Sequence, residues 1–569
     1  MSSDQIYGVT PPMSTQLPTE HEKQMSETLI AELRRQKTFE SPDATQKRYE
    51  VLESLQKICD EFVKKVARVK EPKSEILIKN ARGKVFTYGS FRLGVFGPGS
   101  DIDTLVVAPK YVTREDYFKY FPDLLTEMAP EGAIDDLTVV TDAFVPIIMF
   151  EYHGISIDLI FSRIIQKQLA PNFDLKDSGL LRGLDEAELR SLNGTRVTDE
   201  ILALVPEQST FRLALRAIKL WAQRRAVYGN IMGFPGGVAW AMLVARVCQL
   251  YPKAAPAVIV NKFFLIMSQW RWPQPVLLKP IESGPLPVRV WNPKVYKGDS
   301  FHLMPIITPA YPSMCATFNI TKSSMSIIQR ELQRGLEITE KIMMDKQPWT
   351  DLFVKHTFFT QGYKYYISVI SCSKGNEANK VWSGYIESKV RMLVQKLEQH
   401  QNIQLAHAFM KGFARKHRCK TDQEIEQVQE GSLDYVIKED KKDGAKDEKT
   451  TEADAGDKEK SDVEAAPEEI FTNTHYIGLE LTPGAKALDL SFQVDEFKEL
   501  CTQWQKYKDE LSSLVSINVQ HVRNFNLPDD VFDEGETKPQ RKSSGKKRGP
   551  SDDNQPPAKR QQASVAAAG

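Results

Sequence analysis

Apolar residues near the start of the chain recur at helical spacing and then change to the alternation typical of strands. The stripe from Leu52 to Val66 lies on one face if residues 45–69 are helical, and residues 27–35 follow the same pattern. Apolar alternation further on predicts strands over 85–88, 102–107, 143–151 and 155–161, with a helix over 114–128.

The periodicity changes again beyond residue 205, and this change predicts a multidomain α+β protein. Residues 211–251 and 324–344 have helical spacing, whereas 364–371 and 474–480 alternate and 382–400 is helical. A chain of 569 residues is too long for one core. We therefore expect domains over 1–205, 206–351 and 352–530, with the N-terminal helices also candidates for packing on the second domain.

Composition is that of an ordinary folded protein, with 41% hydrophobic and 26% charged residues. Six scattered cysteines contain no C-x-x-C pair, which indicates buried free thiols. The uncharged run 226–245 contains Asn230, Pro235 and four glycines, so we expect a loop leading into a buried helix. No secretory signal pattern begins the chain. Location in the cytosol or nucleus, without membrane association, is therefore expected.

The net charge of zero hides two oppositely charged segments. Residues 438–469 carry 13 acidic and 7 basic side chains, and residues 538–560 carry 8 basic and 2 acidic ones. The first composition predicts a disordered acidic insertion within the third domain, and the second a disordered basic tail over 531–569. Since the two segments cancel, the folded remainder is neutral, and any nucleic-acid surface must be a local patch.

Candidate chemistry is concentrated in residues 87–107. Gly89 and Ser90 end a predicted strand and open a short helix, whose free N–H groups suit phosphate. Asp101 and Asp103 follow on an extended segment, where side chains two apart face the same way. Asp158, the acidic residue of the later apolar strand GISIDLI, completes a candidate Mg²⁺ site. One D-x-D is weak evidence of function, but the whole combination predicts metal-dependent nucleotidyl transfer.

A second group of polar residues lies in the predicted helix that begins near Phe211. Arg216, Lys219 and Gln223 share the face opposite the apolar stripe, so the helix is expected to present cations to a cleft. A solvated basic face is the alternative interpretation.

These segments together resemble those of the DNA polymerase β-like nucleotidyltransferases, and most closely of the nuclear poly(A) polymerases of the fungal type. The resemblance extends over about 28–530 and includes FTYGSFRLGVFGPGSDIDTLVV, GISIDLI, LNGTRVTDEIL, RAIKLWAQRRAVYGN, GFPGGVAWAMLVARVCQLYP and MPIITPAYPSMCATFNIT. It implies a polymerase β-like palm in the first domain, a helical central domain and an RRM-like α+β RNA-binding domain.

The resemblance also implies roles for individual residues in template-independent addition of AMP from ATP to mRNA 3′ ends. Asp101 and Asp103 would bind two divalent ions, Mg²⁺ or Mn²⁺, and Asp158 would bind the ion that activates the primer. Tyr88, Gly89 and Ser90 would contact phosphates, and Lys219 and Tyr228 the ATP phosphate and base. The other implied nucleotide-binding residues are Ser100, Ile102, Phe144, Val145, Asn193, Asn230, Gly237 and Val238.

Partners follow from the same resemblance. We expect an RNA 3′ end, ATP and the cleavage and polyadenylation complex, with the protein a monomer outside that complex. The basic clusters of the tail, such as Arg541 and Lys542, suit a nuclear import receptor, and the nucleus is the expected location. The basic run 411–420 is either an RNA contact or a solvated loop. It contains no RNP1-like motif, so ordinary RRM stacking is not expected.

Two other functions remain open at this stage. A cytoplasmic poly(A) or poly(U) polymerase or a CCA-adding enzyme would share the same motifs, because few contacts set nucleotide choice. A catalytically inactive RNA-binding scaffold would keep the fold, although the retention of all three aspartates argues against it.

Overall fold

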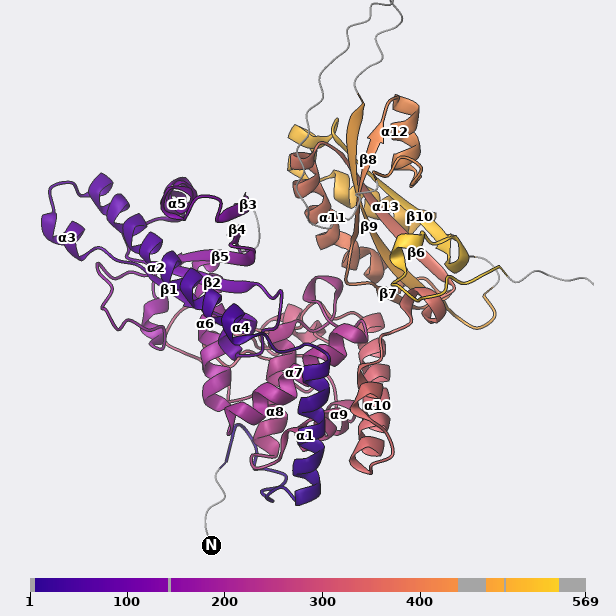
Figure 1. Cartoon of the computed structure of the whole chain (residues 1–569), viewed down its shortest axis with the longest axis horizontal. Helices are drawn as coiled ribbons and strands as arrows, with labels where there is room; N and C mark the ends of the chain where they lie inside the picture. The colour runs from indigo at the N-terminus through magenta and orange to yellow at the C-terminus, as the bar shows by residue number, and fades with distance from the viewer. Residues whose placement is uncertain (1–5, 142–144, 438–466, 486–487, 542–569) are drawn as a thin grey trace, which may run out of the picture.

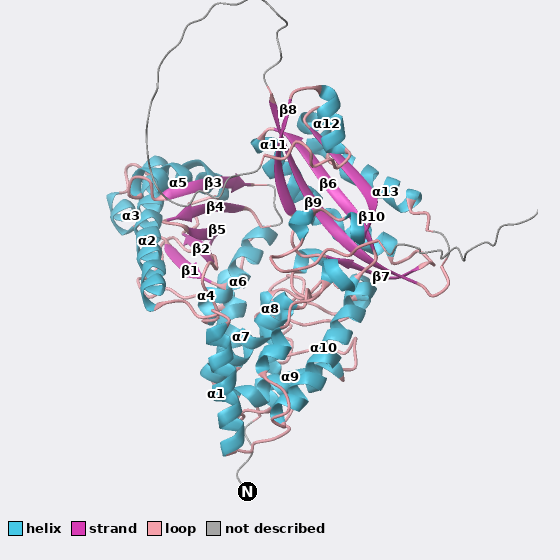
Figure 2. Cartoon of the chain, turned by 45° about the vertical axis from the view of Figure 1, so that its right-hand side comes forward, coloured by secondary structure: helices cyan, strands magenta, loops and turns pink. Residues whose placement is uncertain are grey.

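In the computed structural model, which describes residues 6–141, 145–437, 467–485 and 488–541, two sheet-containing parts stand on a helical part (Figure 1). The N-terminal and C-terminal sheets lie on opposite sides of the molecule above the central helices, and Figure 2 shows the same arrangement after rotation. The predicted multidomain α+β fold is confirmed.

The N-terminal part is a five-stranded sheet covered by helices on both faces. Its strand order is β1-β2-β5-β4-β3, and β2 and β5 are the parallel pair. The strands are β1 (Lys84–Thr87), β2 (Ile102–Ala108), β3 (Ile134–Val140), β4 (Ile147–Tyr152) and β5 (Ile155–Arg163). The helices are α2 (Pro42–Lys70), α3 (Glu75–Asn80), α4 (Gly89–Leu93), α5 (Arg114–Met128) and α6 (Glu186–Leu204).

Local sequence explains where these helices begin. Thr113 accepts a hydrogen bond from the Asp116 N–H while the Asp116 side chain accepts one from the Thr113 N–H, and this capping box starts α5 at the predicted residue. Ser41 caps α2 in a similar way, with Pro42 in its first turn. Helices α2 and α5 then bury their apolar stripes against β2 and β5.

Strand β3 is absent from the predicted set, and the physical reason is its place at the edge of the sheet. Asp135 and Asp136 are both exposed, and the pairing with β4 shifts register between Asp135 and Thr138, so no apolar alternation marks the strand. The strand predicted over 143–151 begins later, at Ile147, and residues 142–144 lie outside the described part.

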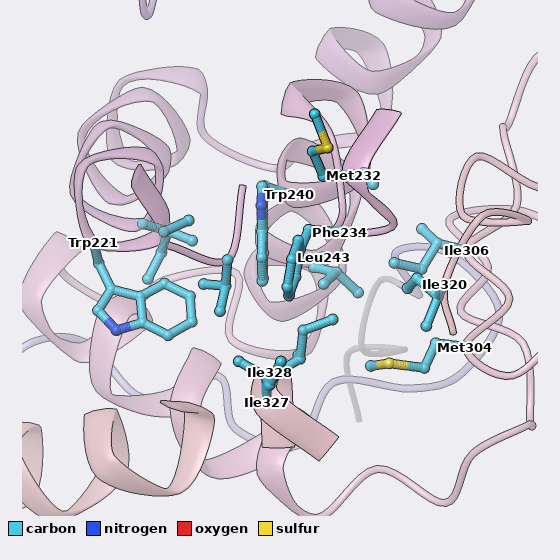
Figure 3. Packing of buried hydrophobic residues seen from close by; sticks show 14 of the residues in the cluster. Trp221, Met232, Phe234, Trp240, Leu243, Met304, Ile306, Ile320, Ile327 and Ile328 are labelled. Carbon is cyan, nitrogen blue, oxygen red and sulfur yellow. The ribbon is translucent and has the colours of Figure 1, made fainter. Parts of the chain in front are cut away.

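The central part consists of helices and a long irregular segment before the last of them, and it is built around a tryptophan-rich core. Its helices are α7 (Gln208–Arg224), α8 (Gly237–Leu250), α9 (Pro256–Ser268) and α10 (Lys322–Met343). The Trp221 ring packs edge-on against Trp240 at 5.4 Å and Phe264 at 4.9 Å between centroids. Figure 3 shows Trp221 and Trp240 together with Phe234, Ile327 and Ile328 from neighbouring segments.

One expectation about this part is confirmed, and a second holds for α1 but not for α2, which packs on the N-terminal sheet. Every residue of α8 from Ala239 to Leu250 is buried, so the uncharged run is a loop leading into a core helix. Helix α1 (Glu20–Arg35) packs on the central helices rather than on the N-terminal sheet, because Met25, Leu29 and Leu33 join their core. Within the described ranges, no helix is long and apolar enough to cross a bilayer.

The C-terminal part is an antiparallel sheet with helices on both faces. The strands are β6 (Tyr365–Lys374), β7 (Ile403–Ala408), β8 (Phe413–Cys419), β9 (Glu468–Leu481) and β10 (Val515–Arg523), ordered β10-β6-β9-β7 with β8 also paired to β9. The helices are α11 (Asn376–Leu397), α12 (Asp422–Gln429) and α13 (Ser491–Thr502). The inner face of this sheet and α11 share one continuous core with the central helices.

Two expectations about the C-terminal part need correction, and a third concerns residues that the structure largely does not describe. The run 411–420 is not a loop but mostly strand β8, in which Arg415 is buried and paired with Asp530. The acidic insertion lies outside the described residues except for 467–469, where β9 already begins. The tail was expected from residue 531, but Val531 is buried and Asp533 pairs with Lys355, so the fold extends further than predicted.

All six cysteines are free and buried, as expected.

Candidate active site

Three carboxylates converge at the end of the parallel strand pair. Asp101 immediately precedes β2, Asp103 lies in β2, and Asp158 of β5 is its direct partner across the pair. One oxygen from each of the three lies within 4.8 Å of the others. Parallel pairing places side chains of the same register on one face, so the pairing of β2 with β5 creates the cluster.

The cluster is electrostatically costly by itself. Burial, reinforced by Asp101 and Asp158, raises the pKa of Asp103 to about 7. Burial and then Asp101 raise the pKa of Asp158. Among the described residues no hydrogen bond or ion pair compensates these three side chains. Such a set of converging oxygens fits a hard divalent cation.

A cavity of about 680 Å³ opens beside the cluster, between the N-terminal sheet and the central helices. That volume is within the range of small-molecule sites, about 300–1,000 Å³. Twelve of the residues predicted from the sequence line it, namely Tyr88, Gly89, Ser90, Asp101, Asp103, Val145, Asn193, Lys219, Tyr228, Asn230, Gly237 and Val238. The structure therefore brings together segments more than 100 residues apart.

Gly89 is held close to the cluster by the backbone. The Tyr88 N–H donates to the Asp103 carbonyl, which continues the β1–β2 pairing to the N-cap residue of α4. Gly89 then has φ +60°, and a Cβ at this position would overlap the Asp103 carboxylate. Only glycine combines a positive φ with the absence of a Cβ, so only glycine fits this position without an energetic cost.

Helix α7 supplies a cation to the same space. Burial, and then Arg216, lower the pKa of Lys219, while Asp101 and Asp103 act in the opposite direction. Burial, followed by the charges of Asp101 and Asp103, raises the pKa of Tyr228 to about 12. Both side chains therefore face the carboxylates from the central part.

Asn193 of α6 presents an unpaired polar atom at the cavity. Its side chain lines the cavity, and its Oδ1 is buried without a hydrogen-bond partner among the residues that the structure describes. A buried acceptor without a donor is unfavourable, so this oxygen is suited to a ligand hydroxyl.

Four predicted residues do not line the cavity. Asp158 belongs to the carboxylate cluster but is not one of the residues that line the cavity. Ser100 accepts a hydrogen bond from the Gly97 N–H in the turn before β2. The Ile102 side chain is fully buried in the core on the opposite face of the strand from Asp101 and Asp103, so only its backbone is left for a contact with nucleotide. Phe144 lies outside the described residues.

Arg216 is a correction, since it does not face the cleft. Its guanidinium donates to the carbonyls of Phe96 at 2.7 Å and Gly94 at 3.3 Å, and also to that of Thr38. It therefore fastens α7 to the loop after α4.

Sequence reasoning missed the apolar wall of the cavity. Met314 and Phe318, in the irregular segment before α10, line the cavity while 43% and 54% exposed. Periodicity could not identify them because the segment has none. The segment is one of those that resemble the nuclear poly(A) polymerases, but the resemblance did not assign a role to these two side chains.

Three family models match the chain in sequence order. The poly(A) polymerase nucleotidyltransferase domain matches residues 8–205, the poly(A) polymerase central domain 210–355, and the poly(A) polymerase predicted RNA binding domain 357–541. The chain belongs to the poly(A) polymerase family. This membership confirms the resemblance, and with it a nucleotidyltransferase of the poly(A) polymerase type.

Curated relatives in this family align over nearly the whole chain. Poly(A) polymerase pla1 of Schizosaccharomyces pombe is 50% identical over 94% of this chain and 94% of its own length. Poly(A) polymerase PAPa of Candida albicans is 49% identical over 94% and 95%. The poly(A) polymerase of Dictyostelium discoideum is 40% identical over 95% of this chain and 61% of its own length.

Among solved structures, the match to a Cid1 poly(U) polymerase covers 59% of this chain and 99% of that chain, with a TM-score of 0.39 and 12% sequence identity. A likeness this low has no bearing on nucleotide choice.

Proposed function

We propose that this family member adds AMP from ATP to RNA 3′ ends without a template, in pre-mRNA 3′-end processing. The observation that carries the proposal is the convergence of Asp101, Asp103 and Asp158 beside a cavity that also receives Lys219 and Tyr228. The proposal assigns catalysis to residues 1–205, closure of the nucleotide site to 206–351 and RNA binding to 352–530.

Asp101, Asp103 and Asp158 would hold two divalent ions, Mg²⁺ or Mn²⁺. Their oxygen-only donor set, their mutual distances and the raised pKa of Asp103 all suit hard cations. The bound ions would supply Lewis-acid chemistry, favouring ionisation of the primer hydroxyl and neutralising charge on the triphosphate.

The reaction is a displacement at phosphorus. The primer 3′-oxygen attacks the α-phosphorus of ATP, the α–β phosphoanhydride bond breaks, and pyrophosphate leaves. Lys219, held in a partly desolvated position facing the carboxylates, would bind the charged phosphates. Gly89 and Ser90 would let the triphosphate approach the backbone closely because no side chain intrudes at Gly89.

The rest of the cavity would hold the nucleoside. Asn193 would accept a hydrogen bond from the ribose through its unpaired Oδ1. Tyr228, whose hydroxyl lies against Gly237, would contact the nucleotide together with Val145, Asn230 and Val238. Ser100, Ile102 and Phe144 remain in the proposal only as neighbours of these groups, Ile102 through its backbone.

Primer extension tests the proposal directly. We expect extension of an unstructured RNA by ATP with Mg²⁺, little extension with the other three nucleoside triphosphates, and none with Asp103→Asn. Asp135→Asn is the matched control, because Asp135 is an exposed carboxylate on β3 of the same sheet. Extension with UTP or CTP would assign a sister activity, and a lack of any extension would favour the scaffold.

The cellular part of the proposal is nuclear location as a monomer that joins the cleavage and polyadenylation complex. The support for nuclear location is the cluster of basic residues in the tail, including Arg541, Lys542 and Lys546, which suits an import receptor. A fluorescent fusion lacking residues 541–569 should leave the nucleus while keeping primer extension in vitro. Unchanged nuclear accumulation would refute the role of the tail.

A further inference from the structure

The loop between α7 and α8 leaves its helix in a conformation that needs support. Ala226, just after the end of α7, has φ +56°, a region that residues with a Cβ adopt only at a cost. Two residues later the same loop places Tyr228 in the nucleotide cavity, followed by Asn230 and Gly236. Whatever stabilises Ala226 therefore also sets the position of these cavity residues.

The support comes from the C-terminal sheet. His407 of β7 is fully buried, and its Nε2 lies 2.9 Å from the Ala226 carbonyl oxygen. Because a carbonyl only accepts, Nε2 must carry the proton. In the neutral ring Nδ1 is then an acceptor, and the Tyr363 hydroxyl donates to it across 2.7 Å. Burial lowers the pKa of His407 to about 3, which keeps the ring neutral.

The same imidazole also touches the far end of the loop. The centroid of its ring lies 5.2 Å from that of Phe234, which precedes α8, and 5.0 Å from that of Phe358. His407 therefore contacts the loop near both of its ends, at Ala226 and at Phe234, and Phe358 packs beside it.

Two further contacts tie the start of the loop to fixed elements. Arg225 donates to both oxygens of Glu331 of α10, at 2.8 and 3.0 Å, and to the Val354 carbonyl at 2.8 Å. The His356 N–H donates to the Arg224 carbonyl at 2.8 Å. These contacts place the end of α7, and His407 determines the direction in which the chain continues.

We propose that His407 is a positioning residue of the nucleotide site, through which the C-terminal domain sets the loop that carries Tyr228 and Asn230. The inference rests on the proposed function, since its ligand is ATP. It predicts that affinity for ATP depends on a buried residue of the RNA-binding part that does not itself line the cavity.

The test uses the full chain with His407→Leu and His407→Gln. Leu removes both hydrogen bonds, whereas Gln keeps an amide N–H that can reach the Ala226 carbonyl. We expect His407→Leu to raise the KM for ATP about tenfold with kcat within about twofold, and His407→Gln to stay within about threefold of wild type. ATP titration without primer should show the same order of dissociation constants.

Glycine at the supported position provides a rescue. Ala226→Gly removes the cost of the positive φ. The double variant His407→Leu/Ala226→Gly should therefore have a KM for ATP about threefold lower than that of His407→Leu alone. The dissociation constant of a 3′-deoxy-ended RNA should remain within about twofold of the wild-type value in each of these variants. A role in folding alone would produce neither the rescue nor the separation of ATP from RNA.

His417→Leu is the matched control, because His417 is equally buried in the adjoining strand β8 but bonds Thr472 rather than the loop. It should lower the melting temperature and leave the KM for ATP unchanged. Equal KM effects of His407→Leu and His417→Leu, or a wild-type KM in His407→Leu, would overturn the inference. A wild-type protein that neither binds nor uses ATP would instead refute the proposed function.

Should His407→Leu fail to fold, Tyr363→Phe makes the same test by removing only the hydroxyl that orients the ring. A KM for ATP raised about threefold supports the inference, and an unchanged KM overturns it.

Discussion

Asp103 is the residue at which stability and the proposed function are in conflict. Its carboxylate is largely buried beside Asp101 and Asp158, and that environment raises its pKa to about 7. A raised pKa in the folded state means that stability is fully present below the unfolded value, near 4, and is lost as the pH rises through about 7. At pH 8 without metal, the ionised cluster therefore weakens the folded state.

Asp103→Asn should stabilise the metal-free protein at pH 8 by on the order of 2–4 kcal/mol while reducing primer extension about 1000-fold. Thermal unfolding in a chelating buffer measures the first effect. Addition of Mg²⁺ should raise the midpoint of the wild type more than that of the variant. A variant that melts below wild type in the chelating buffer would contradict this account of the cluster.

Gly89→Ala should abolish extension, because the added Cβ combines a positive φ with overlap of the Asp103 carboxylate. The matched control is Gly154→Ala in the β4–β5 turn, which has φ +74° but no atom within 4 Å of the added Cβ. Both variants carry the backbone cost, about 1–2 kcal/mol, and only the first has the clash. Equal activity of the two would rule out the clash as the cause.

At the scale of elements, the C-terminal strands bury an unusual set of histidines. His407, His417 and His475 are buried on β7, β8 and β9, and the partly buried His356 lies ahead of the turn at Phe358–Gly362 that precedes β6. Burial is the largest cause that lowers each pKa, to about 3 for His407 and about 4 for the other three. A sheet with neutral histidines inside is stable only while they stay unprotonated.

This sheet should lose stability as the pH falls from about 7 toward 4. The unfolded chain takes up protons near pH 6.5 and the folded chain does not, so each histidine lowers the free energy of unfolding by up to about 1.4 kcal/mol per pH unit. Melting curves at pH 7.5, 6 and 5 measure the slope, and His417→Gln should flatten it. An identical slope in the variant would mean that carboxylates alone cause the acid sensitivity.

At the scale of the whole molecule, the cavity belongs to no single part. The N-terminal sheet contributes the carboxylates, and the central part contributes Lys219 from α7 and Tyr228 from the loop after it. The C-terminal sheet supports that loop through His407. Arg216 links the first two parts through backbone carbonyls of the loop after α4. Figures 1 and 2 show the two sheets separated from each other, each next to the central helices.

A substrate that bridges two of these parts should draw them together. We expect ATP, Mg²⁺ and a 3′-deoxy-ended primer, which cannot be extended, to reduce the radius of gyration measured by solution scattering. Leaving out Mg²⁺ is the control, since the carboxylates would then repel the triphosphate. Identical scattering curves with and without the complete set would disprove closure.

The sequence by itself determined the features that depend on local periodicity and local chemistry. The placement of Asp101 and Asp103 on one face follows from the two-residue repeat of a strand, and α5 follows from its capping box. The burial of the first part of α8 follows from the uncharged run that ends at residue 245. The same periodicity places the Ile102 side chain on the opposite face, so its proposed contact with nucleotide is limited to the backbone.

Only the tertiary structure decided which distant segments meet. Asp158 joins the cluster because β5 pairs with β2 in a register that places it beside Asp103, and nothing near Asp158 in the sequence specifies that register. His407 reaches the loop of the nucleotide cavity from a strand in which no residue was assigned to the site, and Phe318 lines the cavity from an irregular segment without periodicity. Periodicity reports which face of an element is buried, whereas the partner of that face is chosen by packing over the whole chain.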